Sequence, residues 1–195
     1  MKRPALILTA LGLGALLGNA IPALTQPSAR AVQLLDGAIA FVQPPQLLEA
    51  TTTRDRAQTR NATYYFTLEL PEAAGEPLAK VVIEQHNARL TSNLRYHLDE
   101  SAAFAGYPRG ERSPLPLSNV SQDEDSEAIT FTFEPPVEPG QVVTLSLSPV
   151  RNPRWGGTYL FGVTAFPEDE QVRSQFAGYG RLRIYDRDSD SDFRP

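Results

Sequence analysis

The chain has 195 residues, a formal net charge of −5 and no cysteine. The acidic balance argues against nucleic acid as a partner, because phosphates require a basic face that releases their counterions. It also argues against an electrostatic grip on anionic lipid. The lack of cysteine excludes disulfide bonds, thiol redox chemistry and thiolate metal sites.

The N-terminal segment has the three parts of a secretory signal peptide. Lys2 and Arg3 precede an uncharged stretch rich in Leu, Ala and Gly at residues 4–24, and the small-residue motif Ala29-Arg30-Ala31 follows. We therefore predict that residues 1–31 are a signal peptide that is cleaved on export. Gly18-Asn19-Ala20 also has small residues at the spacing of a cleavage site, so the position of the cut stays open.

A retained membrane anchor is disfavoured, because Pro22 and several glycines dilute the apolar run below the roughly 20 apolar residues that a spanning helix needs. No cysteine follows the run, which excludes a bacterial lipoprotein. Cleavage after Ala31 removes three basic residues and no acid. The remaining 164 residues then carry 15 basic and 23 acidic side chains, a net charge of −8. A chain of that length is long enough for one domain with a single core.

Short apolar or alternating runs separated by Pro, Gly and polar clusters follow, and this pattern is typical of strands and turns. In chain order the predicted strands are 38–42, 46–53, 62–70, 78–85, 94–98, 128–134, 141–149, 157–166 and 178–185. The clearest is 62–70, in which alternate residues share a face. One face carries Tyr64, Phe66, Leu68 and Leu70, and the other carries Tyr65, Thr67 and Glu69.

The later strands carry further expectations. The two strands at 128–134 and 141–149 are separated by a Pro- and Gly-rich reversal, so we predict an antiparallel hairpin over 128–149. The strand at 157–166 is apolar on both faces, as expected in the middle of a sheet. The last strand, 178–185, should bury Leu182 and Ile184 and expose Arg181 and Arg183.

These seven to nine strands, with no amphipathic helix of three turns, predict an all-β fold: a single antiparallel, immunoglobulin-like β-sandwich over residues 32–185. The pattern is weak at 87–120 and 167–177. Residues 186–195 are polar and alternately charged, and we predict a disordered acidic tail.

Metal binding is the first chemistry to test, and the sequence offers few ligands. His86 and His97 are the only histidines, and the single Met lies in the predicted signal. The two histidines fall on different predicted strands, so a shared site with nearby carboxylates is an alternative and ordinary surface histidines are favoured. The tail at 186–192 has an acid at every second position but lacks the glycine and distal glutamate of a calcium loop. No cofactor is predicted.

Catalytic patterns are also absent from the sequence. Nucleophilic catalysis needs a Ser or Thr with a base held by a third group, and no G-x-S-x-G or comparable set marks one. The 23 acidic residues allow many carboxylate pairs, none in a recognisable context, so a hydrolase with paired carboxylates remains a third alternative.

The turn before the strand at 157–166 is the most informative segment. It places Arg151, Asn152, Arg154 and Trp155, the only tryptophan, between two predicted strands. Arg and Trp are the residue types that dominate binding hot spots, so these four residues are the candidate partner-binding site. The structural alternative is that Asn and Pro shape the turn, Gly156-Gly157 permit positive φ, and the indole covers the end of the sandwich.

Several segments together resemble one known family. They are VQLLDG, FVQPPQLLEATTT, ATYYFTLELPEAAGEPLAKVVIEQ, PVRNPRWGGTYLFGVTAFP and GYGRLRIYD, and they span nearly the whole predicted mature chain. This combination is similar to the cyanobacterial exported proteins of the family "domain of unknown function 2808". The resemblance implies a periplasmic, thylakoid-lumenal or released protein and no particular activity. The acidic Glu168-Asp169-Glu170 and the Asp-rich tail depart from the family pattern.

The sequence thus favours an exported, non-enzymatic β-sandwich module that binds a protein or an envelope component, with no nucleic acid partner and no stable membrane insertion once the signal is removed. An extracytoplasmic metal-binding protein that uses His86 and His97 is the alternative, and a hydrolase is the third.

Overall fold

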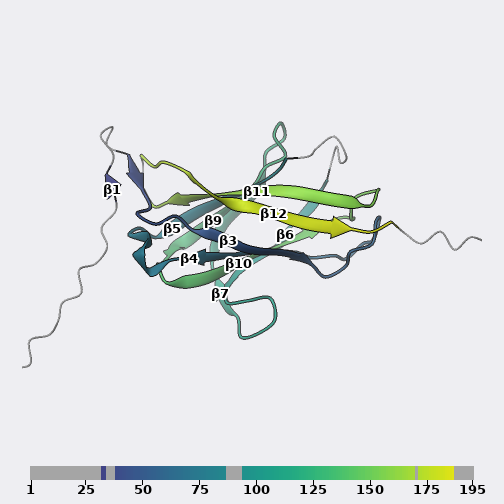
Figure 1. Ribbon diagram of the computed structural model, residues 1–195, viewed down its shortest axis with the longest axis horizontal. Coiled ribbons are helices and arrows are strands. Elements are labelled where there is room, and N and C mark those ends of the chain that lie inside the picture. Colours follow the sequence, from purple (N-terminus) through teal and green to yellow (C-terminus); the bar gives the residue numbers. More distant parts are fainter. Residues whose placement is uncertain (1–31, 34–37, 87–93, 170, 187–195) are drawn as a thin grey trace, which may run out of the picture.

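Two antiparallel sheets packed face to face form the protein, as the computed structural model shows for residues 32–33, 38–86, 94–169 and 171–186 (Figure 1). Each sheet has five strands. The prediction of an all-β sandwich is confirmed. The predicted signal at 1–31 lies outside the described residues, as does the tail after Asp186. No described helix has the length and apolar character to cross a membrane.

The first sheet has the order β3-β4-β10-β6-β7 and the second β12-β11-β5-β9-β8. The strands of the first sheet are β3 (Gln46–Thr52), β4 (Tyr64–Leu70), β10 (Gln141–Pro149), β6 (Tyr96–Ala105) and β7 (Ser113–Leu115). Those of the second are β12 (Gln175–Ile184), β11 (Gly157–Pro167), β5 (Leu78–Gln85), β9 (Ile129–Val137) and β8 (Leu117–Gln122). A separate pair, β1 (Val32–Gln33) and β2 (Ile39–Ala40), and a 3-10 turn, η1 (Glu72–Ala74), complete the described elements.

Alternation of apolar residues places the core between the two sheets. In β4 the predicted inner face is buried: Tyr64, Phe66, Leu68 and Leu70 are each 1 % exposed or less. From the facing sheet, Phe161 of β11 approaches Phe66 edge-to-face, with ring centroids 5.5 Å apart. β11 lies between β12 and β5, so the prediction of a central strand is confirmed. In β12, Leu182 and Ile184 are buried while Arg181 and Arg183 are exposed, as expected.

The predicted hairpin at 128–149 is wrong. β9 pairs with β5 and β8, whereas β10 pairs with β4 and β6 in the other sheet. The reversal does occur, but Gly140 (φ 85°) donates its N–H to the Leu70 carbonyl (2.9 Å) and so leads the chain onto β4. The physical reason is that both strands have an apolar face to bury, and a short connection can join such strands across the core as well as within one sheet.

The stretch at 87–120, where the pattern was weak, contains more strand than expected. β6 is longer than the predicted 94–98, and β7 and β8 were not predicted. The reason is that β7 and β8 are edge strands with many exposed polar residues, so they lack a clear alternating apolar pattern. Proline lacks a backbone N–H, and Pro114 is tolerated in β7 because one side of an edge strand forms no ladder hydrogen bonds.

The edge strands β3 and β12 come together on one side of the sandwich (Figure 1), and two glycines of β12 make this approach close enough. A Cβ on Gly178 would lie 3.2 Å from the Leu47 Cβ, and one on Gly180 would lie 2.7 Å from the Ala50 Cβ. The glycines therefore fix β12 beside β3, and with it the surface described next.

Candidate functional site

Three segments far apart in the sequence meet at one end of the sandwich. They are the loop at 53–60 between β3 and β4, the turn at 150–156 between β10 and β11, and residues 183–186 at the end of β12. The Ala57 N–H donates to the Tyr185 carbonyl (2.8 Å), and the Gln58 N–H donates to the Pro153 carbonyl (2.9 Å). The turn at 150–156 therefore rests on a hydrogen-bonded support.

Asn152 holds these segments together from inside. It is 3 % exposed. Its side-chain N–H groups donate to the carbonyls of Arg54 (2.8 Å) and Arg56 (2.9 Å), and its Oδ1 accepts from the Tyr64 hydroxyl (3.0 Å). Its backbone N–H donates to the Thr59 carbonyl (2.8 Å). Of the four predicted binding residues, Asn152 thus has a buried, structural position.

The other three predicted residues lie on the surface. Arg151 and Arg154 are exposed, and Trp155 is 56 % exposed, so the indole does not cover the end of the sandwich. The Arg154 guanidinium lies over the indole, 4.9 Å from its centroid. The Tyr159 hydroxyl donates to the Trp155 carbonyl (2.6 Å) and ties the turn to β11. A large ring and a guanidinium are therefore presented to solvent on a fixed backbone.

Asp186 secures the turn from its other side. The Gly156 N–H donates to the Asp186 Oδ1 (2.6 Å). Burial, and then the negative charge of Asp186, raise the pKa of Tyr159. Gly156 has no room for a side chain, because a Cβ there would lie 2.7 Å from the Asp186 nitrogen. The glycine is thus required by this close approach.

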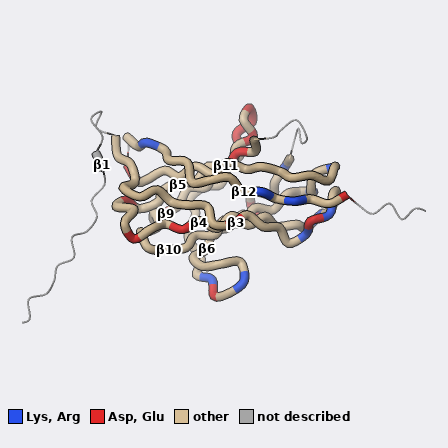
Figure 2. The backbone as a smooth tube through the Cα atoms, in the orientation of Figure 1, with Lys and Arg blue, Asp and Glu red and all other residues tan. Residues whose placement is uncertain are grey.

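Most of the charged side chains on the solvent-facing side of these three segments are arginines. Seven are exposed, on the three joined segments and on β12 just before its end: Arg54, Arg56, Arg60, Arg151, Arg154, Arg181 and Arg183. We call these seven residues the arginine surface. Only Asp55 and Asp186 oppose them within 54–60, 151–156 and 181–186, so these segments carry a net charge of +5 in a chain of −5. Figure 2 shows blue segments along the end of β12 and in the loops beside it.

The two histidines are not brought together. His86 follows β5, on the outer face of the second sheet, where its ring meets the edge of Tyr179 (centroids 5.2 Å apart). His97 lies on β6 in the first sheet and lines an open hollow of about 300 Å³ with Glu100 and Asn61. Among the described residues no group of three or more His, Cys, Asp or Glu is arranged to hold a metal ion. The structure therefore does not form the shared histidine site of the metal-binding alternative.

Carboxylates likewise fail to face each other across a described cleft. A hollow of about 440 Å³ beside β5 and β11 contains two acids, Glu168 and Asp169, but they are consecutive exposed residues of one loop. Glycoside hydrolysis requires two carboxyl groups that flank the scissile bond. This hollow does not have that arrangement.

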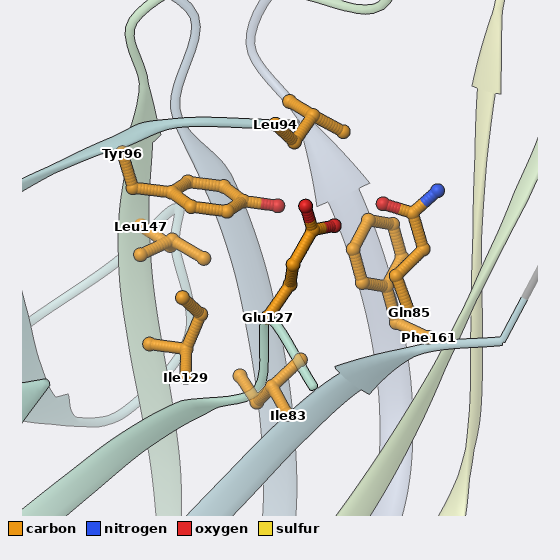
Figure 3. A pocket seen from close by; sticks show the side chains of 8 residues that line it. All are labelled: Ile83, Gln85, Leu94, Tyr96, Glu127, Ile129, Leu147 and Phe161. Atoms are coloured by element: carbon orange, nitrogen blue, oxygen red, sulfur yellow. The ribbon is translucent and has the colours of Figure 1, made fainter. Parts of the chain in front are cut away.

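A small cavity lies between the sheets, where Glu127 points inward (Figure 3). Its carboxylate is directed between the Tyr96 hydroxyl and the Gln85 amide, above apolar side chains such as Leu147 and Phe161. The cavity volume is about 10 Å³, which is at most the space of one water molecule. This cavity is too small for a ligand.

Buried tyrosines predict a loss of stability at alkaline pH. Burial, and then neighbouring tyrosines, raise the pKa of Tyr64, and burial, followed by the Glu127 charge, raises the pKa of Tyr96. Both values lie above that of an unfolded tyrosine, about 10. Their contribution to stability is thus fully present below about pH 10 and is lost as the pH rises further.

We expect Tyr64 and Tyr96 to contribute tyrosinate absorbance only when the circular dichroism signal of the fold is lost, because their pKa values are raised in the folded protein. Tyr96→Phe should make the unfolding free energy fall less steeply with pH. Complete ionisation of all tyrosines while the fold persists would contradict this prediction.

Three of the four candidate residues thus lie exposed on one turn and Asn152 is buried, while their role in binding stays a prediction. The sequence did not indicate that Arg54, Arg56 and Arg60 lie beside this turn. The Arg-rich composition of 54–60 is visible in the sequence, but no local signal indicates that this loop lies against a turn almost a hundred residues later.

A family model described as "Protein of unknown function (DUF2808)" matches residues 38–184. The matched range begins just before β2 and ends with β12, so it contains both five-stranded sheets. A search of curated proteins finds no match.

Solved structures with a similar arrangement of strands are distant. BslA, a bacterial hydrophobin, is 14 % identical with a TM-score of 0.41, over 74 % of this chain and 96 % of that chain. The collagen-binding domain of a Staphylococcus aureus adhesin is 5 % identical with a TM-score of 0.35, over 64 % and 87 %. Self-complemented MyfA, the major subunit of Myf fimbriae from Yersinia enterocolitica, is 11 % identical with a TM-score of 0.36, over 73 % and 99 %. At these scores the likenesses carry no argument about function.

Proposed function

Because the chain belongs to the family described as "Protein of unknown function (DUF2808)", whose description assigns no activity, we propose a function from the surface itself. The protein is an exported, non-enzymatic β-sandwich module that binds a protein or an envelope component. Arg151, Arg154 and Trp155 form the contact, and Asn152 supports it from within.

The observation that carries this proposal is the exposure of Trp155 on a fixed turn. An indole that is 56 % exposed offers a partner a large apolar surface, and Trp is among the residue types that dominate binding hot spots. The surrounding hydrogen bonds hold the turn in one conformation, so little ordering entropy is lost when a partner binds. The Arg154 guanidinium lies over the indole and is itself exposed, so a guanidinium and an aromatic ring are offered to a partner at one position.

The compartment belongs to the same proposal. We infer export to the periplasm, the thylakoid lumen or the medium of a cyanobacterium, from the features of residues 1–31 and from the family resemblance. Removal of that segment leaves a module that is not inserted in a membrane.

Affinity capture tests the contact. The mature protein, Arg154→Ala/Trp155→Ala and the control Arg109→Ala/Tyr107→Ala are each used to capture partners from envelope extract. The control removes an exposed arginine and a ring that is 50 % exposed from another loop. We expect the first variant to lose the captured component and the control to retain it, with circular dichroism unchanged in both. Equal capture by all three proteins would refute the contact.

A further inference from the structure

We propose that the outer face of β12, continuous with the arginine surface, binds an anionic polysaccharide whose sugars carry carboxylate or sulfate groups. The inference rests on the proposed function and names the chemical class of the envelope component.

β12 and the residue that follows it, Tyr185, present an outward row of aromatic and arginine side chains. In chain order the row consists of Phe176, Tyr179, Arg181, Arg183 and Tyr185, all exposed. The rings of Phe176 and Tyr179 touch, with centroids 4.7 Å apart, and the Arg183 guanidinium lies 5.3 Å from the Tyr185 centroid. At about 3.3 Å per residue the row is about 30 Å long. A row of this length on a sheet face suits a polymer that binds side-on.

A glycine in the neighbouring strand β11 gives the aromatic rings room to lie close to the sheet. Gly162 of β11 pairs with Tyr179, and the His86 ring lies directly over Gly162, where a Cβ would displace the ring from this position. The edge of the same His86 ring meets Tyr179. The aromatic end of the row is thus a platform two strands wide, with a polar nitrogen at its border.

Both halves of the row match one kind of ligand. A pyranose ring offers a C–H face to an aromatic side chain and a rim of hydroxyl groups to polar ones. A guanidinium binds a carboxylate or a sulfate through two parallel hydrogen bonds. Arg181 and Arg183 are two residues apart and therefore about 7 Å apart along the strand. Neighbouring acidic groups of one chain can engage both.

Charge distribution favours a sparsely charged polymer over a dense one. The net charge is +5 over the segments 54–60, 151–156 and 181–186, so the rest of the chain has a net charge of −10. Duplex nucleic acid has one charge per about 1.7 Å of its axis and requires a broad basic face. A narrow basic row in an acidic protein fits a polysaccharide with about one charge per sugar.

Affinity electrophoresis with polygalacturonate in the gel tests the proposal. Dextran is the neutral reference, dextran sulfate distinguishes sulfate from carboxylate, and a single-stranded oligonucleotide and polyglutamate represent other polyanions. The variant Arg181→Gln/Arg183→Gln is compared with Arg109→Gln/Arg112→Gln, which makes the same change in net charge on exposed arginines elsewhere. Tyr179→Ala tests the aromatic half of the row.

We expect the full mature protein to be retarded by polygalacturonate or dextran sulfate and not by dextran, with retardation that falls as salt is added. Arg181→Gln/Arg183→Gln should weaken binding by about tenfold or more, Tyr179→Ala should weaken it too, and the control should not. Equal loss in the control pair, equal retardation by dextran, or tighter binding of the oligonucleotide or polyglutamate would overturn the proposal.

Failure of this inference can be told apart from failure of the proposed function. If Arg154→Ala/Trp155→Ala loses its envelope partner but neither acidic polysaccharide binds, the contact stands and the ligand class is wrong. If an acidic polysaccharide binds through Arg181 and Arg183 while envelope capture is unchanged in Arg154→Ala/Trp155→Ala, the ligand class stands and the turn at 151–155 is not the contact.

Discussion

Asn152→Ala is expected to lower the free energy of unfolding by about 2–4 kcal/mol, because the buried side chain makes three hydrogen bonds and is the acceptor of the buried Tyr64 hydroxyl. The substitution leaves the Tyr64 hydroxyl without its acceptor. It also removes one of the two donors of each of the Arg54 and Arg56 carbonyls, which keep the Thr52 hydroxyl and the Thr59 N–H. Each buried polar group that loses its partner costs about 1–3 kcal/mol. Urea denaturation of the mature protein measures the change.

Two control variants separate this network from a general effect of losing an amide. Asn119→Ala, at an exposed position of edge strand β8, should change stability by less than about 0.5 kcal/mol. Tyr64→Phe removes only the hydroxyl and should cost about 1–2 kcal/mol. If Asn152→Ala were no more harmful than Asn119→Ala, the turn would not depend on this network.

Gly180→Ala is the second substitution with a large expected effect. The added Cβ would lie 2.7 Å from the Ala50 Cβ and 3.3 Å from the Phe66 Cε1. The Ala50 methyl is attached directly to the β3 backbone and cannot rotate away, so β12 must move from β3. Overpacking of this kind costs about 1–3 kcal/mol, and thermal unfolding should show the loss.

A second change at the facing position tests that explanation. Ala50→Gly alone should destabilise slightly, because glycine weakens a strand by about 0.5–1 kcal/mol. Combined with Gly180→Ala it removes the clash, so the double variant should be more stable than the sum of the two single changes by about 1 kcal/mol. Strict additivity would show that the two edges do not touch at this point. Gly162→Ala is a useful contrast, since the exposed His86 ring that it meets can swing aside.

Local sequence pattern predicted which face of a strand is buried more reliably than which strand lies beside it. In β4 and β12 the alternation alone identifies the core residues, because burial requires only a period of two. The pairing of 128–134 with 141–149 was wrong because the same alternation serves a connection across the core. Whether the two strands pair with each other or lie in different sheets depends on their long-range pairing, of β10 with β4 and of β9 with β5.

The candidate site shows the same limit at the level of single side chains. The sequence predicted a turn before the strand at 157–166, from its Asn, Pro and Gly residues, but left open whether Trp155 faces solvent or covers the end of the sandwich. The burial of Asn152 was not predictable, because the carbonyls that it bonds lie on a loop 98 and 96 residues earlier. The role of Gly178 and Gly180 was equally invisible, since it depends on two sheet edges that meet only in the folded chain.

Photocrosslinking in the native host tests the central claim most directly, that the arginine-rich end of the sandwich is a binding surface. A photoreactive amino acid is placed at Trp155 in one variant and at Tyr107, an exposed ring on another loop, in a second. The account predicts a defined adduct on irradiation of the first variant and none from the second. Adducts of equal yield from both positions, or from Tyr107 alone, would contradict it.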